Sequence, residues 1–211
     1  MDLLDKELSL YVEQHTEPES GLLQKINRDT HAKVMMPRML SGHLQGRVLS
    51  MISHMVQPKF ILEIGTYTGY SALCLSEGML QDGELVTIDI NEELEEKVRQ
   101  YFHDAGVSES INYIIGNAMD VIPQLNHTFD MVFIDADKIN YSNYFDTVID
   151  KVRAGGYIIA DNVLWSGKVL DTRPDKDTKA IDDFNKKVHK DQRVQNVLFP
   201  IRDGLMILRK L

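Results

Sequence analysis

The chain has 211 residues, of which 43% are hydrophobic and 26% are charged, and its formal net charge is −9. These values are typical of a globular protein, and we expect one domain over residues 1–211 with a helical extension over 1–38. No apolar run approaches the roughly 20 residues that span a bilayer, and no basic block is present, so we expect neither a membrane nor a nucleic-acid partner.

The first quarter of the chain is predicted to be helical. Residues of about 2–15 and 20–34 mix polar and apolar side chains with helical spacing. Ser41 is predicted to cap a third helix, which Pro58 ends. The apolar stripe of that helix is expected to consist of Leu44, Val48, Met51, Ile52 and Met55.

Strands and helices then alternate to the end of the chain. Strands are predicted over 60–64, 83–89, 111–115, 129–134, 157–160, 194–199 and 205–208, and helices over 70–79, 91–105, 120–125, 141–152 and 175–190. Gly155 and Gly156 are expected to form a turn before the fifth strand. The alternation predicts an α/β fold with a mostly parallel sheet, covered by helices and closed by an antiparallel hairpin. The single cysteine, Cys74, excludes an internal disulfide and favours a cytoplasmic location.

A glycine loop joins the first predicted strand to its helix. Residues 63–71, E-I-G-T-Y-T-G-Y-S, contain G-x-x-x-G with the bulky Tyr67 inside, which differs from the G-x-G-x-x-G of NAD-binding proteins. Asp89, at the end of the second strand, could accept the ribose hydroxyls of an adenosine group. Glu63 suits the ammonium and sulfonium of S-adenosyl-L-methionine better than a pyrophosphate. The alternative is that the glycines form only a tight turn and that Asp89 caps the next helix.

Oxygen donors follow two further predicted strands. Asp135 ends V-F-I-D, and Asp161 and Asn162 end I-I-A-D-N. Because ligands bind at the carboxyl ends of parallel strands, these three side chains could converge and hold Mg²⁺, Mn²⁺ or Ca²⁺. The alternative for these residues, and for Asp137, is turn and cap chemistry.

Lys138 completes a possible reaction centre. A divalent cation nearby favours the neutral form of a lysine, which can accept a proton. A cation bound to a catechol-type hydroxyl pair lowers the pKa of the hydroxyl, Lys138 removes its proton, and the oxygen attacks the sulfonium methyl in line.

At residues 63–71, 133–141 and 161–165 the chain resembles the cation-dependent class I O-methyltransferases, the group of catechol and caffeoyl-CoA O-methyltransferases. The resemblance extends from about residue 39 to the C-terminus. It implies a Rossmann-like, doubly wound fold with seven strands, the last reversed, helices on both faces of the sheet, and a homodimer.

The resemblance also implies roles for individual residues. Asp135, Asp161 and Asn162 would hold the metal and Lys138 would be the base. The implied contacts with S-adenosyl-L-methionine are Met39, Ser41, Glu63, Gly65, Tyr67, Ser71, Asp89, Ala118 and Asp135. Trp165 and Asp203 would lie near the phenolic acceptor, although Trp165 could serve only packing and Asp203 only a hairpin turn.

The chain departs from its relatives at several positions. Arg47 stands where relatives often have Gln, Met119 replaces a polar residue near the adenine, and residues 168–179 show no acyl-CoA pattern. These differences leave the acceptor open. A metal-independent methyltransferase, an NAD oxidoreductase and a cofactor-binding module without catalysis are the alternatives.

Overall fold

A seven-stranded sheet organises the protein. The computed structural model describes residues 5–211, and its strand order is β3-β2-β1-β4-β5-β7-β6. The strands are β1 Phe60–Ile64, β2 Glu84–Asp89, β3 Ile111–Ile115, β4 Phe129–Ile134, β5 Val152–Ala160, β6 Val194–Phe199 and β7 Leu205–Lys210. Strand β7 runs antiparallel to β5 and β6, whereas the pairs from β3 to β5 are parallel. The predicted α/β fold with a reversed last strand is confirmed.

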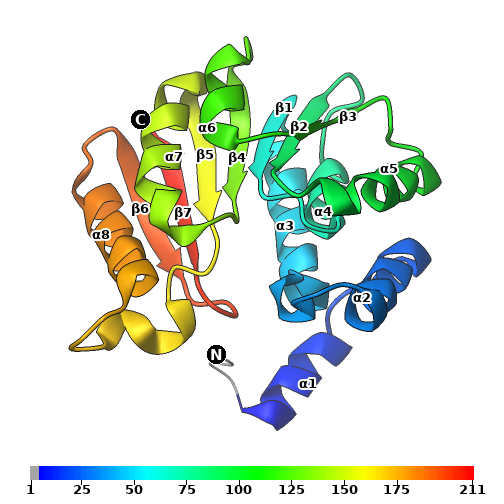
Figure 1. Cartoon of the computed structure of the whole chain (residues 1–211), viewed down its shortest axis with the longest axis horizontal. Coiled ribbons are helices and arrows are strands. Elements are labelled where there is room, and N and C mark those ends of the chain that lie inside the picture. The colour runs from blue at the N-terminus through cyan, green and yellow to red at the C-terminus, as the bar shows by residue number, and fades with distance from the viewer. Residues whose placement is uncertain (1–4) are drawn as a thin grey trace.

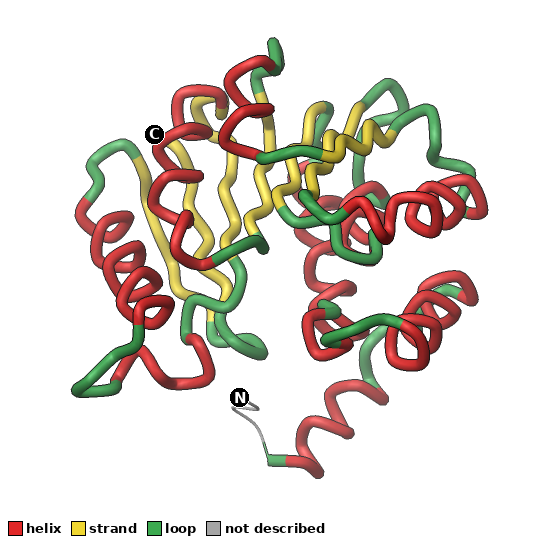
Figure 2. The backbone as a smooth tube through the Cα atoms, viewed as in Figure 1, coloured by secondary structure: helices red, strands yellow, loops and turns green. Residues whose placement is uncertain are grey.

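Helices cover both faces of this sheet (Figures 1 and 2). The α-helices are α1 Lys6–Gln14, α2 Gly21–Lys33, α3 Gly42–Val56, α4 Tyr70–Ser76, α5 Glu95–Asp104, α6 Ala118–Val121, α7 Tyr141–Val148 and α8 Lys176–Lys190. Short 3-10 helices are η1 Pro37–Met39, η2 Glu92–Leu94, η3 Ile122–Gln124, η4 Lys138–Asn140, η5 Ile149–Lys151 and η6 Trp165–Leu170. None of the helices within residues 5–211 combines the length and the hydropathy needed to cross a membrane.

Two apolar layers hold the helices on the sheet. On one face, Phe145 of α7 and Phe184 of α8 pack against Val132 and Ile158 of the central strands. On the other face, Leu49 of α3 and Phe102 of α5 pack with residues of α2 and α4. The continuous apolar runs seen in the sequence are therefore strands buried on both sides, as expected for a parallel sheet. Helix α1, by contrast, has no buried residue.

The apolar stripe predicted for α3 is only partly packed on the core, where Val48 and Ile52 lie. Met51 and Met55, which belong to the predicted stripe, are 57% and 75% exposed. The face that is buried consists of small and polar residues with one leucine: Gln45, Gly46, Leu49, Ser50 and Ser53. Small side chains allow close approach, and a Cβ atom on Gly46 would lie only 2.6 Å from the ring of Tyr70 in α4. Close helix packing has overridden the apolar periodicity here.

Two local predictions also need correction. Gly155 and Gly156 do not form a turn before the fifth strand, since they lie inside β5 at an irregularity in its pairing with β4, and Gly155 has φ +76°. Glycine suits such a bulge because it has no Cβ. Ser41 stands at the N-cap position of α3, but its side chain makes no capping hydrogen bond.

The ends of the central strands are joined by backbone hydrogen bonds. The amide of Gly65 donates to Ile88 O at 2.9 Å, and that of Asp135 donates to Ile64 O at 2.9 Å. The amide of Asp161 donates to Ile134 O, again at 2.9 Å. The residues that leave β1, β4 and β5 are thus fixed side by side at one edge of the sheet.

Candidate active site

The carboxyl edge of the sheet gathers most of the predicted site residues. Glu63 lies near the end of β1, Asp89 ends β2, and Asp135 and Asp161 follow β4 and β5. Since β2, β1, β4 and β5 are consecutive neighbours, these four carboxylates share one edge. The parallel order predicted from the sequence accounts for this grouping.

The glycine loop brings the chain against Asp135. Gly65 has φ +100°, and a Cβ atom there would lie 2.0 Å from the carbonyl oxygen of Asp135, so only glycine fits. The amide of Tyr67 donates to Asp89 Oδ2 at 2.7 Å, and that of Asn91 donates to Asp89 Oδ1 at 2.9 Å. Asp89 therefore does fix the surrounding turns, and its carboxylate keeps free lone pairs for a hydroxyl donor.

Glu63 is a fully buried carboxylate with one oxygen unpaired. Thr87 Oγ1 donates to its Oε2 at 2.5 Å, while Oε1 has no hydrogen-bond partner among residues 5–211. Burial, together with the nearby negative charges of Asp135 and Asp89, raises the pKa of Glu63 to about 8. A buried carboxylate of this kind is stabilised by a cationic group, and the ammonium of a ligand could supply the charge.

The remaining predicted cofactor residues surround this loop. Ser71 lies in the first turn of α4, and Ala118 begins α6; both are buried. Ser41 is buried at the start of α3, whereas Met39 is 53% exposed. The Tyr67 hydroxyl donates to Met35 O at 3.1 Å, which holds the segment before Met39 against the loop.

Asp135 and Asp161 form a pair of close carboxylates. Asp161 is 2% exposed, and burial and the charge of Asp135 raise its pKa to about 7. Lys138, the amide of Gln45 and the backbone amide of Asn162 oppose this shift. The Lys138 ammonium lies 3.0 Å from Asp135 Oδ1, so the predicted base and a predicted metal ligand are in direct contact.

Lys138 is held on a buried tyrosine. Its Nζ donates to the hydroxyl of Tyr141 at 2.6 Å, and that hydroxyl in turn donates to Asp161 O at 3.0 Å. The ring of Trp165 lies 5.9 Å from Nζ, and its buried indole nitrogen has no hydrogen-bond partner in the part of the chain that the structure describes. The Lys138 ammonium therefore lies near two aromatic rings, those of Tyr141 and Trp165.

The oxygen donors suit a hard divalent cation. Two carboxylates and one amide, from Asp135, Asp161 and Asn162, are the ligand types that Mg²⁺, Mn²⁺ and Ca²⁺ prefer. Asn162 has φ +60°, a conformation that asparagine adopts more readily than most residues. Among the described residues no group of three His, Cys, Asp or Glu side chains could hold a metal, so the amide of Asn162 would have to be one of the ligands.

Asp203 has structural contacts in the β6–β7 turn. Its Oδ1 accepts the amide of Ser166 at 2.5 Å, and its carbonyl oxygen accepts the amide of Leu164 at 2.8 Å. This agrees with the hairpin-turn alternative, while a contact with the acceptor stays a prediction.

Sequence reasoning missed Gln45, Tyr141 and Arg202 as parts of this region. Tyr141 lies within the motif that follows β4, and its spacing of three residues from Lys138 was the available signal. Gln45 and Arg202 had no local signal, because their contacts join segments 157 residues apart.

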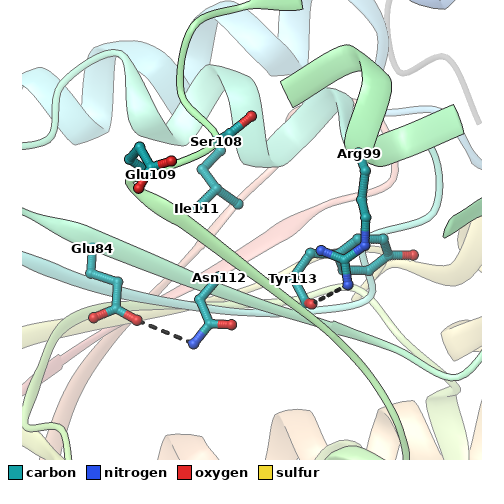
Figure 3. A pocket seen from close by; sticks show the side chains of 7 residues that line it. All are labelled: Glu84, Arg99, Ser108, Glu109, Ile111, Asn112 and Tyr113. Carbon is teal, nitrogen blue, oxygen red and sulfur yellow. Dashed lines mark hydrogen bonds between the residues drawn. The ribbon is translucent and has the colours of Figure 1, made fainter. Parts of the chain in front are cut away.

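Two surface hollows lie elsewhere. One, of about 470 Å³, is at the opposite end of β2 and β3, where Asn112 donates to Glu84 and Arg99 donates to the carbonyl of Tyr113 (Figure 3). A second, of about 330 Å³, is lined by residues of α2, α4 and α5. Neither is lined by a predicted site residue.

Comparison with known sequences identifies similar proteins over nearly the whole chain. Residues 12–211 match the profile of the family described as O-methyltransferase. Caffeoyl-CoA O-methyltransferase 5 of Nicotiana tabacum is 36% identical over 208 residues, which cover 92% of this chain and 85% of the relative. Caffeoyl-CoA O-methyltransferase 1 of Arabidopsis thaliana is also 36% identical, with coverage of 92% and 79%.

Solved structures share the fold. The SAH-bound methyltransferase PaMTH1 of Podospora anserina superposes with a TM-score of 0.90 at 28% identity, covering 100% of this chain and 98% of its own. The O-methyltransferase TomG of Streptomyces achromogenes, in complex with SAM, has a TM-score of 0.90 at 26% identity and covers 99% of both chains.

The raised pKa of Glu63 predicts a pH-dependent stability. In the unfolded chain the carboxyl ionises near 4.5, and in the folded chain near 8. Its contribution is therefore complete below about pH 4.5 and is lost as the pH rises through about 8. Glu63→Gln should remove this loss, so between pH 5 and pH 8 the variant should gain on the order of a few kcal/mol relative to wild type.

Urea unfolding of the ligand-free protein at several pH values measures this difference. The exposed Glu92→Gln is the matched control and should follow the wild-type profile, since its side chain is solvated. Parallel profiles for wild type and Glu63→Gln would contradict the raised pKa.

Proposed function

The chain belongs to the O-methyltransferase family, and from this membership we propose that it transfers a methyl group from S-adenosyl-L-methionine to a hydroxyl of a small catechol-like or phenolic acceptor, with assistance from a divalent cation. The observation that carries the proposal is the ion pair of Lys138 with Asp135, beside the buried carboxylate of Asp161 and the glycine loop. The caffeoyl-CoA relatives and the SAM-bound neighbour support the class of donor and acceptor.

The methyl donor would lie along the glycine loop. The unpaired oxygen of Glu63 and the carboxylate of Asp135 suit its cationic methionine end, and Asp89 suits the ribose. We propose as further donor contacts Met39, Ser41, Gly65, Tyr67, Ser71 and Ala118.

The cation would be held by Asp135, Asp161 and Asn162. When bound, a divalent cation supplies Lewis-acid chemistry that lowers the pKa of an acceptor hydroxyl and orients it. Asp161, buried beside Asp135, provides negative charge at this place that water does not screen.

Lys138 would act as the base. Its Nζ accepts the proton of the acceptor hydroxyl while the hydroxyl oxygen attacks the methyl carbon and the carbon–sulfur bond breaks. Tyr141 holds Nζ in place at 2.6 Å, and the ring of Trp165 could stack on a planar acceptor. Asp203 is proposed as a further acceptor contact.

Two alternative functions also use the methyl donor: one enzyme would need no metal, and one protein would bind the donor without catalysing a reaction. A metal-independent methyltransferase would have no use for the buried carboxylate of Asp161 near Asp135, where burial first and then the charge of Asp135 raise the pKa of Asp161. A binding module without catalysis would have no use for Lys138 between Asp135 and Tyr141. We therefore favour the metal-assisted enzyme.

We also propose a homodimer. The apolar stripe of α3, which includes the exposed Met51 and Met55, gives this surface the character of a protein contact.

Methyl transfer to a test catechol is expected to require both a cation and Lys138. Chelation by EDTA should abolish turnover, and added Mg²⁺ or Mn²⁺ should restore it. Lys138→Met should lower kcat by about 10²–10⁴-fold, the usual effect of a positioned base. Measured with labelled S-adenosyl-L-methionine, the affinity for the donor should stay close to the wild-type value.

The exposed Lys190→Met, on the far end of α8, is the matched control and should keep full turnover. Full activity in EDTA would contradict the metal role, and near-normal kcat in Lys138→Met would exclude the lysine as the base.

Light scattering on the purified protein tests the dimer. Wild type should have twice the mass of one chain, and the double variant Met51→Glu with Met55→Glu should be monomeric, because two charges would be buried in the contact. Leu170→Glu, at a side chain that is 85% exposed on η6, should remain dimeric. A dimeric double variant would place the contact elsewhere.

A further inference from the structure

Gln45 is a buried polar residue whose side chain contacts Asp161, 116 residues further along the chain. It lies in the first turns of α3, is 1% exposed, and its Nε2 donates to Asp161 Oδ2 at 2.5 Å. The next residue, Gly46, lets α3 pack against Tyr70 at a distance that no larger residue permits. Gln45 is therefore carried on a helix whose position is closely fixed.

Arg202 sets the orientation of the Gln45 amide. Its Nη1 donates to Leu40 O at 3.1 Å and to Gln45 Oε1 at 3.4 Å. A guanidinium has donors only, so the Gln45 oxygen must face Arg202 and the nitrogen must face Asp161. The turn between β6 and β7 thereby determines which group meets the carboxylate.

Both oxygens of Asp161 receive a neutral donor. Oδ2 accepts from Gln45, and Oδ1 accepts from the backbone amide of Asn162 at 2.6 Å. A neutral amide fixes the plane of a carboxylate without cancelling its charge, whereas a lysine or arginine at the same place would compete with a bound cation. Each oxygen keeps a further lone pair.

From these contacts we propose that Gln45 and Arg202 are positioning residues that orient the Asp161 carboxylate toward a divalent cation. The inference rests on the proposed metal site and adds to it a specific second layer, in which Arg202 acts through Gln45 and Gln45 acts through Asp161. Partners of metal ligands commonly matter in this way, since their loss weakens metal affinity by about 10–100-fold.

Mn²⁺ binding to the purified protein, followed by the EPR signal of free Mn²⁺, tests the proposal without turnover. Gln45→Met keeps the length and bulk of the side chain but removes both hydrogen bonds, and it should weaken Mn²⁺ binding by about 10–100-fold. Calorimetry should show little change in affinity for S-adenosyl-L-methionine, because Asp161 is not among its proposed contacts.

Arg202→Met supplies a second variant. It should weaken Mn²⁺ binding in the same direction but less, since the amide of Gln45 remains. The double variant should bind Mn²⁺ no more weakly than Gln45→Met alone, because residues that act through one another are not additive. If Gln45→Met does not fold, Arg202→Met tests the proposal alone, because Arg202 is only half-buried. Unchanged Mn²⁺ affinity in Arg202→Met would then overturn the proposal.

Ser53→Ala is the matched control. Ser53 is a buried polar residue of the same helix, and its hydroxyl donates to Leu75 O at 2.5 Å, away from Asp161. Its loss should lower the melting temperature while Mn²⁺ affinity stays at the wild-type value.

Mn²⁺ binding by wild type and by Gln45→Met distinguishes the metal site from the positioning role. Wild-type protein that binds no Mn²⁺ would remove the proposed metal site and this inference with it. Wild-type protein that binds Mn²⁺ while folded Gln45→Met binds it within twofold would overturn the positioning role alone.

Discussion

The site depends on backbone hydrogen bonds that extend the parallel ladder one residue past the strand ends. The amide of Gly65 donates to Ile88 O, one residue before the end of β2, and the amides of Asp135 and Asp161 donate to the last carbonyls of β1 and β4, all at 2.9 Å. Each chain therefore leaves the sheet beside its neighbour, and the close approach at Gly65 keeps β1 and β4 together at this edge. Side chains placed directly after the strands converge without any flexible loop to position them.

This convergence has an electrostatic cost. Glu63 and Asp161 are both buried, and burial near other carboxylates raises the pKa of each. The surrounding contacts offset only part of that cost, through Lys138 and Gln45 at Asp161 and through Thr87 at Glu63. A fold that concentrates negative charge in this way is prepared for cationic ligands, and the sulfonium donor and the divalent cation of the proposed reaction are both cationic.

Much of this arrangement follows from the sequence, and the parts that do not have identifiable causes. Apolar runs marked all seven strands, and the parallel order brought Asp135 and Asp161 together. The buried face of α3 could not be found from hydrophobicity, because this face packs closely against α4 at Gly46 and consists mainly of small and polar residues. The contact of Arg202 with Gln45 depends on tertiary structure across 157 residues, and no local pattern records it.

The central claim is that Asp135, Asp161 and Asn162 together hold a divalent cation next to Lys138. A crystal grown with Mn²⁺ and measured at the manganese absorption edge tests this directly. We predict one anomalous peak per chain, about 2.0–2.6 Å from oxygens of all three residues, the range of hard cation–oxygen bonds. No peak at this edge of the sheet, or a peak bound by other residues, would contradict the account.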